Sequence, residues 1–344
     1  MKIGIVNSLN LEKRTGVEEY VYQILKHFPI VDEYKNHQFF LLAPFISNEV
    51  KNIAGYTLKV LKWPFKFFWT QIRLSWEMLK NPIDILFVPA HTFPLIHPKL
   101  VIMIHGLEYE NVPNVYSWWQ RTKSRFLTKR NAKKANKIIV PSQSVKDDLI
   151  KFYQTEPEKI FVIHHGIELS ARGGSASSGK KYILYLGGGH KRKNIEGLKK
   201  AYEILKNKYP PASPAKLGGR GKIQHELVLA GVDKYISAEE KWKLLKNADV
   251  MVYPSLCEGF GFPPLEAQSV GIPVVSSNVS SMPEILKSSA LLVNPHNPEE
   301  IAEAIYKVLS DENLRNELIK RGQENVKRFS WLKCAKETLK VIFN

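Results

Sequence analysis

The chain has 344 residues, of which 44% are hydrophobic, and its 50 Lys and Arg against 33 Asp and Glu give a formal net charge of +17. This length exceeds the roughly 250–300 residues at which a single hydrophobic core stops growing, so two domains are expected. No apolar run approaches the ~20 residues that a membrane-spanning helix needs, which excludes a spanning segment in this sequence.

The N-terminus and the cysteines indicate the compartment. Residues 1–7 are too short for a signal sequence and are typical of a first strand. Cys257 and Cys334 offer neither a disulfide framework nor a metal-ligand spacing, which fits a reducing environment. We expect Cys257 to be a buried thiol without a chemical role. The sequence therefore predicts a cytoplasmic protein.

Apolar runs alternate with helical patterns along the whole chain. Because long crossovers separate the runs, we expect an α/β fold with parallel sheets. The expected strands are residues 2–7, 38–43, 84–88, 100–104, 137–140, 160–163, 182–186, 226–230, 249–252, 273–276 and 290–293.

Two residues in the N-terminal half follow expected strands. Gly16 lies between the first strand and the helical run 17–27, at the corner where Rossmann-like domains meet ligands. His105 stands at the carboxyl end of a buried strand, the edge at which open parallel sheets bind ligands. A plain turn and a structural histidine are the alternatives that the residues alone leave open.

Two segments combine basic and aromatic residues. Residues 59–69 form one, and Trp118 and Trp119 precede the other, in which cations recur every four residues without an acid in the segment: Arg121, Arg125, Lys129, Lys133 and Lys137. Like charges at this spacing repel, so an anionic partner would relieve them. The mixture suits the interface of an anionic membrane. A single-stranded nucleic acid and a plain solvated helix face are the alternatives.

Two stretches rich in glycine, serine or proline interrupt the elements. Residues 172–179 mark the connection between domains or a loose segment just beyond it, and we place the boundary near Gly166. Residues 210–221 fall between a helix and a strand of the second domain and are expected to form a mobile loop.

A glycine loop follows the first strand of the second domain. Residues 185–198 read as strand, loop and helix start, with Arg192 and Lys193 at the helix mouth. Two cations there suit a diphosphate, whose negative charge grows as it leaves. A solvated basic turn is the alternative.

The most informative segment is Glu258-Gly-Phe-Gly-Phe-Pro-Pro-Leu-Glu266. Gly259 and Gly261 allow the main chain to approach a ligand closely, and a helix is expected to begin near Pro263 or Pro264. The free N–H groups of that helix attract phosphate. Glu258 and Glu266 can accept hydrogen bonds from sugar hydroxyls. The segment therefore predicts a phosphorylated sugar as ligand, with helix capping and plain surface acids as the alternative.

This segment resembles the signature of family 4 retaining glycosyltransferases, and the resemblance runs nearly end to end. It implies the GT-B fold, in which two Rossmann-like, doubly wound domains face a cleft. Residues 1–165, with a final helix in 328–344 that crosses back, would form the acceptor domain. Residues 166–327 would form the domain that holds the nucleotide-sugar donor.

The resemblance also implies roles for single residues. Arg192 and Lys193 would bind the donor diphosphate, and Glu258 would position the donor sugar and stabilise charge, while Glu266 would contact the ribose. The backbone amides of Phe260, Gly261 and Phe262 are expected to help bind the donor. Gly16 would face the donor phosphate, and His105 would lie near the donor sugar.

The chain departs from the family pattern at three positions. Gly188 stands where many members have an arginine, Glu18 where a second glycine is usual, and Gly106 where an aspartate often follows the histidine. These departures leave part of the diphosphate clamp and the role of His105 open. His91 resembles a further acceptor-side position.

No Asp-x-Asp pair is placed to hold a metal, so we expect metal-independent chemistry without a cofactor. No carboxylate is clearly placed as a nucleophile, and the family is discussed in terms of front-side attack. The expected reaction moves a hexosyl unit, of mannosyl, glucosyl or N-acetylglucosaminyl type, to a glycan or lipid-linked acceptor in polysaccharide biosynthesis. The alternatives are a sugar-nucleotide epimerase or a phosphorylase of the same fold, and a nucleic-acid-binding protein, which would leave the glutamate motif without a role.

Overall fold

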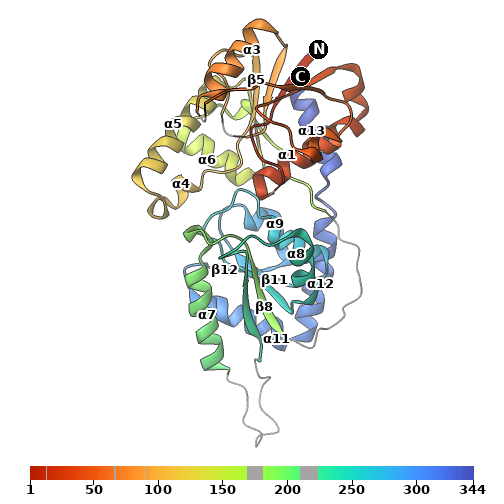
Figure 1. Cartoon of the computed structure of the whole chain (residues 1–344). Coiled ribbons are helices and arrows are strands. Elements are labelled where there is room, and N and C mark those ends of the chain that lie inside the picture. The colour runs from red at the N-terminus through yellow and green to blue at the C-terminus, as the bar shows by residue number, and fades with distance from the viewer. Residues whose placement is uncertain (13, 66, 91, 169–180, 210–223) are drawn as a thin grey trace, which may run out of the picture. The chain divides into compact units, whose positions relative to one another are not determined.

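The structure, a computed structural model, describes the chain except for residues 13, 66, 91, 169–180 and 210–223. His91 and both loose stretches, residues 172–179 and 210–221, therefore lie outside the described residues. The chain forms two compact units (Figure 1). The N-terminal unit comprises Met1–Glu110, Tyr116–Gly166 and Phe329–Asn344, and the C-terminal unit comprises Asn111–Val115 and Ile167–Arg328. Each contains a parallel sheet with helices, so the predicted α/β class is confirmed.

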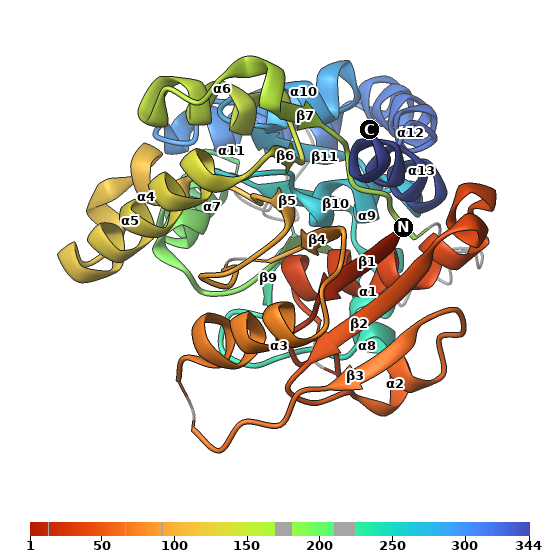
Figure 2. The same ribbon diagram turned by 90° about the horizontal axis from the view of Figure 1, so that it is seen from above.

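The sheet of the N-terminal unit has seven parallel strands in the order β3-β2-β1-β4-β5-β6-β7 (Figure 2). Their bounds are β1 Lys2–Val6, β2 Gln38–Ala43, β3 Thr57–Val60, β4 Ile85–Val88, β5 Lys99–Met103, β6 Lys137–Val140 and β7 Ile160–Val162. Six match the expected strands to within one residue at each end. Strand β3 was not predicted. It pairs with β2 and exposes most of its side chains, so its sequence lacks the apolar run of a buried strand.

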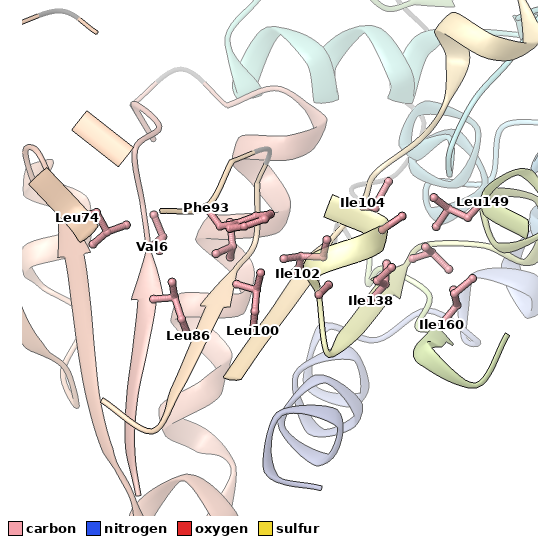
Figure 3. Packing of buried hydrophobic residues seen from close by; sticks show 14 of the residues in the cluster. Val6, Leu74, Leu86, Phe93, Leu100, Ile102, Ile104, Ile138, Leu149 and Ile160 are labelled. Carbon is pink, nitrogen blue, oxygen red and sulfur yellow. The ribbon is translucent and has the colours of Figure 1, made fainter. Parts of the chain in front are cut away.

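Helices pack on both faces of this sheet. They are α1 Gly16–His27, α2 Asn48–Lys51, α3 Leu74–Lys80, α4 Glu108–Asn111, α5 Trp118–Lys134, α6 Gln143–Tyr153 and α13 Trp331–Phe343, with the π-helical segment Trp69–Arg73 directly before α3. Figure 3 shows the core on one face, where Leu86, Leu100 and Ile138 of the strands meet Leu74 of α3 and Leu149 of α6. Buried apolar side chains on both faces explain why the central strands read as nearly continuous hydrophobic runs.

The last helix, α13, returns to the N-terminal unit and lies beside α1 (Figure 1). The ring centroids of Trp331 and Tyr20 are 6.4 Å apart, and Lys137 Nζ donates a hydrogen bond of 2.9 Å to the carbonyl of Val341. A Cβ on Gly166 would lie 2.2 Å from the main-chain nitrogen of Trp331. Close backbone approach therefore requires glycine where the chain leaves this unit.

The basic segment differs from the expectation in two ways. Lys137 belongs to strand β6 and not to helix α5, so it does not continue the helical row of cations. The segment itself contains no acid, but helix α4 supplies one. The buried carboxylate of Glu110 lies 2.8 Å from Arg125 and 3.6 Å from Arg121. Part of the expected repulsion is thus relieved within the protein.

The sheet of the C-terminal unit has five parallel strands in the order β12-β11-β10-β8-β9. The elements are β8 Tyr182–Leu186, α7 Ile195–Lys208, β9 Glu226–Ala230, α8 Ala238–Asn247, β10 Val250–Tyr253, α9 Phe262–Ser269, β11 Val274–Ser277, α10 Met282–Leu286, β12 Leu291–Val293, α11 Pro298–Ser310 and α12 Glu312–Val326. Strands β8 and β10 are neighbours, so the segments that follow their carboxyl ends emerge side by side.

Candidate functional site

The segments after β8 and β10 bring together four side chains, which we call the charged cluster: Arg192, Lys193, Tyr253 and Glu258. Lys193 Nζ lies 2.6 Å from Oε1 of Glu258, and Arg192 Nη1 lies 2.9 Å from Oε2. The hydroxyl of Tyr253 donates to the same Oε1 at 3.1 Å. Two cations and one carboxylate leave the cluster with a net positive charge.

The carboxylate of Glu258 is ionised at neutral pH. Burial alone would raise its pKa, but the charges of Lys193 and Arg192 outweigh burial and lower the pKa to about 2. Burial, with the carboxylate beside it, raises the pKa of Tyr253 well above its ordinary value. Glu258 therefore acts as a fixed negative charge and cannot serve as a general acid.

The turn after Glu258 is shaped by glycine. Gly261 has φ +95°, a left-handed conformation that side chains disfavour, and a Cβ there would lie 2.3 Å from Cε of Met282. Helix α9 begins directly afterwards at Phe262, with prolines in its first turn, where their missing N–H groups cost nothing. The rings of Phe260 and Phe262 lie 5.3 Å apart. The expected helix start near Pro263 or Pro264 thus falls one or two residues after the observed one.

Two serines that no sequence pattern indicated hold the backbone of this turn in place. The N–H of Glu258 donates to Ser280 Oγ at 2.8 Å, while the hydroxyls of Ser280 and Ser281 donate to the carbonyl of Glu258 at 2.7 and 2.9 Å. Arg192 Nη1 also donates to the carbonyl of Cys257 at 3.0 Å. Side chain and main chain of Glu258 are therefore both held.

The second acid of the motif, Glu266, lies on α9 and pairs with a lysine. Lys241 Nζ, from α8, lies 2.5 Å from Oε1 of Glu266. The Glu266 side chain keeps 14% of its surface exposed, twice the 7% of Glu258, so a ligand can reach it more readily. Lys241 is a further residue that sequence reasoning missed.

Gly16 is the first residue of α1 in the N-terminal unit. Thr15 is its N-cap, and the carboxylate of Glu18 accepts from the N–H of Thr15 at 3.2 Å, completing a capping box. The departure from the family pattern at Glu18 thus has a structural reason, since a glycine there could not cap the helix. The adjacent Arg14 pairs with Glu19 and Glu49.

His105 follows β5 in the same unit and is held by its surroundings. Its Nε2 lies 2.8 Å from the carbonyl of Pro89, and because a carbonyl can only accept, Nε2 carries the proton. The ring packs 5.1 Å from Tyr20 and 5.8 Å from His165, whose pKa burial lowers well below its ordinary value. His165 is therefore neutral and adds no charge beside His105.

The C-terminal unit thus unites Arg192, Lys193 and Glu258, and its turn and helix carry the other predicted donor-side residues, Phe260 through Glu266. Gly16 and His105 belong to the N-terminal unit. Cys257 is buried and forms no disulfide, as predicted. Among the described residues, no three His, Cys, Asp or Glu side chains gather as metal ligands, and no helix is long and apolar enough to cross a bilayer.

Comparison with known proteins relates both halves of the chain to one class. Residues 14–171 match the model of Glycosyltransferase Family 4, and residues 167–325 match that of Glycosyl transferases group 1. The chain belongs to the family 4 glycosyltransferases. The predicted family membership is confirmed.

Curated relatives of this glycosyltransferase include bacterial mannosyltransferases. O-antigen chain mannosyltransferase B of Escherichia coli is 36% identical over 169 residues, which are 46% of this chain and 44% of the relative. An uncharacterised glycosyltransferase of Methanocaldococcus jannaschii is 30% identical over 59% of each chain. The chain thus matches only about half the length of these two. O-antigen chain mannosyltransferase RfbU of Salmonella typhimurium is 28% identical, over 76% of this chain and 74% of that protein.

Solved structures share the fold of the whole chain. Sucrose-phosphate synthase from Thermosynechococcus elongatus superposes with a TM-score of 0.71 at 17% identity, covering 99% of this chain and 98% of its own. Anabaena HepE, solved with UDP and glucose, gives 0.71 at 16% identity, covering 100% and 99%. The predicted GT-B fold is therefore confirmed.

Proposed function

We propose that this protein transfers a hexosyl unit from a nucleoside-diphosphate sugar to a glycan or lipid-linked acceptor. The observation that carries the proposal is the charged cluster beside the glycine turn and the N-terminus of α9. A net positive site with main-chain amides nearby matches a pyrophosphate, and carboxylates match sugar hydroxyls.

Arg192 and Lys193 bind the diphosphate of the donor in this proposal. Both already lie within 3 Å of Glu258, so the carboxylate holds their head groups in place before the donor arrives. Preorganised cations stabilise the charge that develops on the leaving phosphate without reorganising during the reaction. They and the amides near Phe260 thus take the part that a metal ion plays elsewhere, and the reaction proceeds without metal or cofactor.

Glu266 binds the ribose hydroxyls of the donor. Its pairing with Lys241 orients the carboxylate and leaves the second oxygen to accept from a hydroxyl. Gly16 and His105 contribute from the N-terminal unit, at the donor phosphate and near the donor sugar.

The stereochemical course we infer is retention by front-side attack. A double-displacement route needs a free carboxylate as nucleophile, whereas Oε1 and Oε2 of Glu258 are each held by a cation. Glu258 therefore positions the sugar and offsets charge. The names of the O-antigen relatives favour a mannosyl donor and a role in polysaccharide biosynthesis. The two buried free thiols fit a cytoplasmic location.

The proposal is tested by calorimetric titration of the full chain with GDP-mannose, UDP-glucose and UDP-N-acetylglucosamine. Glu266→Gln should weaken the best donor about tenfold or more, because a charge-assisted hydrogen bond is lost. Glu312→Gln, at an exposed position of α12, is the matched control and should bind as the parent does. Equal affinity of Glu266→Gln and the parent would refute the role of Glu266.

Two further assays separate the alternatives. Isomerisation of the donor in the absence of any acceptor would identify an epimerase instead. Activity that is lost on chelation and restored by Mg²⁺ would contradict metal-independent transfer.

A further inference from the structure

The N-terminal unit carries a group of large apolar side chains that point into solvent, which we call the apolar surface: Ile72, Trp76, Leu79, Leu95, Ile96, Trp118, Trp119 and Phe126. Their exposed fractions reach 62% for Trp76, 68% for Phe126 and 75% for Trp119. Single exposed apolar residues are ordinary, but a contiguous group marks an interaction site.

Helix α3 and the segment before it are apolar on two sides. Leu74 and Met78 are buried in the core, while Ile72, Trp76 and Leu79, at spacings of four and three, form a stripe on the solvent side. A helix that is apolar on both sides is typical of one covered by a partner.

Hydrogen bonds and a cation–π contact join α3 to α5 through the loop after β4. The N–H groups of Leu95 and Ile96 donate to Ser75 Oγ of α3 at 2.9 and 3.3 Å. Arg130 of α5 lies 4.1 Å above the ring of Phe93 and donates to the carbonyl of Pro94 at 3.2 Å. The three elements therefore lie side by side, and each of them carries exposed apolar side chains.

Cations flank the aromatic residues on α5. Lys123, Lys129 and Lys133 are exposed, and none has an acid within ion-pair distance among the residues that the structure describes. Lys123 lies one helical turn from both Trp119 and Phe126, so charge and aromatic rings share one face. This pattern complements a surface that is negative outside and apolar beneath.

We propose that the apolar surface and the lysines of α5 dock the N-terminal unit onto an anionic lipid bilayer. The aliphatic members decide against a nucleic acid, because Ile72, Leu79 and Leu95 offer no ring on which a base could stack, whereas they enter the boundary of the acyl chains. Tryptophan occupies the headgroup level, and lysine contacts anionic headgroups. Docking of this kind is separate from the proposed reaction and does not depend on the donor.

The test is co-sedimentation of the full chain with vesicles of phosphatidylcholine, with and without phosphatidylglycerol. The parent should bind the anionic vesicles and release them at high salt. Replacing Lys123, Lys129 and Lys133 by glutamine should weaken this binding on the order of 100-fold, about fivefold for each cation. The matched control replaces Lys200, Lys243 and Lys320, which are exposed elsewhere, and should bind as the parent does.

A second variant tests the apolar part. Trp76→Ser combined with Leu79→Ser and Phe126→Ser should also lose vesicle binding, while its circular dichroism stays that of the parent because all three side chains are exposed. Three outcomes would overturn the proposal. They are equal vesicle binding by variants and parent, binding of single-stranded RNA without binding of vesicles, and self-association that the apolar variant abolishes while vesicles are not bound.

Discussion

Replacing Glu258 by glutamine tests the charged cluster directly. The change keeps the size of the side chain but removes the negative charge that lies within 3 Å of Lys193 and Arg192. Lys193 is 9% exposed, so its ammonium would remain buried without a counter-charge. We therefore expect a large loss of stability.

The size of the loss follows from two independent routes. The pKa of Glu258 falls from the ordinary 4.5 to about 2 on folding, which corresponds to about 3 kcal/mol of folding free energy. Removing one partner of a buried ion pair costs about 3–5 kcal/mol. Because the pKa is lowered on folding, this contribution is full above pH 4.5 and is lost as the pH falls toward 2.

The assay is urea unfolding of the full chain at pH 7 and at intervals down to pH 3, followed by circular dichroism. Glu258→Gln should lose about 3 kcal/mol at pH 7, and the difference from the parent should shrink at the acidic end. Glu303→Gln is the control, since it breaks an exposed i,i+4 pair with Lys307 and should leave stability unchanged.

Pyrophosphate adds a second readout to this variant. Replacing the carboxylate by an amide raises the net positive charge of the cluster by one, so added pyrophosphate should stabilise Glu258→Gln more than it stabilises the parent. A stability loss below about 1 kcal/mol would refute the buried pair. An equal effect of pyrophosphate on both proteins would refute the assignment of these cations to a phosphate site.

Three further predictions concern backbone, core and thiols. Gly261→Ala should lower the free energy of unfolding by about 1–3 kcal/mol and weaken donor binding, because φ is +95° and the new Cβ would meet Met282. Gly188→Ala is the control and should do neither, because the nearest atom to its Cβ would be 3.6 Å away. Trp331→Ala should lower the free energy of unfolding by about 3–5 kcal/mol, and a loss under 1 kcal/mol would contradict its place in the core. Both cysteines are buried and burial raises the pKa of the Cys334 thiol, so a thiol reagent should label the native chain far more slowly than the chain in urea; rapid native labelling would contradict this.

The sequence predicted the buried strands well because their signal is local. Eleven expected strands correspond to observed ones, since each is an apolar run bounded by turn residues. Strand β3 was not predicted because the Thr57–Val60 segment is an exposed edge strand. Its pairing with β2 depends on backbone hydrogen bonds. Edge strands of this kind carry little hydrophobic pattern.

Individual site residues could be predicted from the sequence, but not which of them are in contact. Arg192 and Glu258 were singled out separately, but their pairing depends on β8 and β10 being neighbours, which no local pattern encodes. Lys241, Ser280 and Ser281 were missed for the same reason. Once strand order is known, residues after adjacent carboxyl ends become the natural candidates for contact.

The return of α13 to the first unit has a consequence for biosynthesis. Ribosomes deliver Met1–Gly166 long before Phe329–Asn344, so the side of α1 against which α13 packs stays uncovered while the intervening domain is translated. The N-terminal unit therefore cannot complete its own packing during elongation and depends on residues 329–344 to do so. A premature stop codon anywhere in that tail would leave two apparently complete domains, one of which lacks part of its interior.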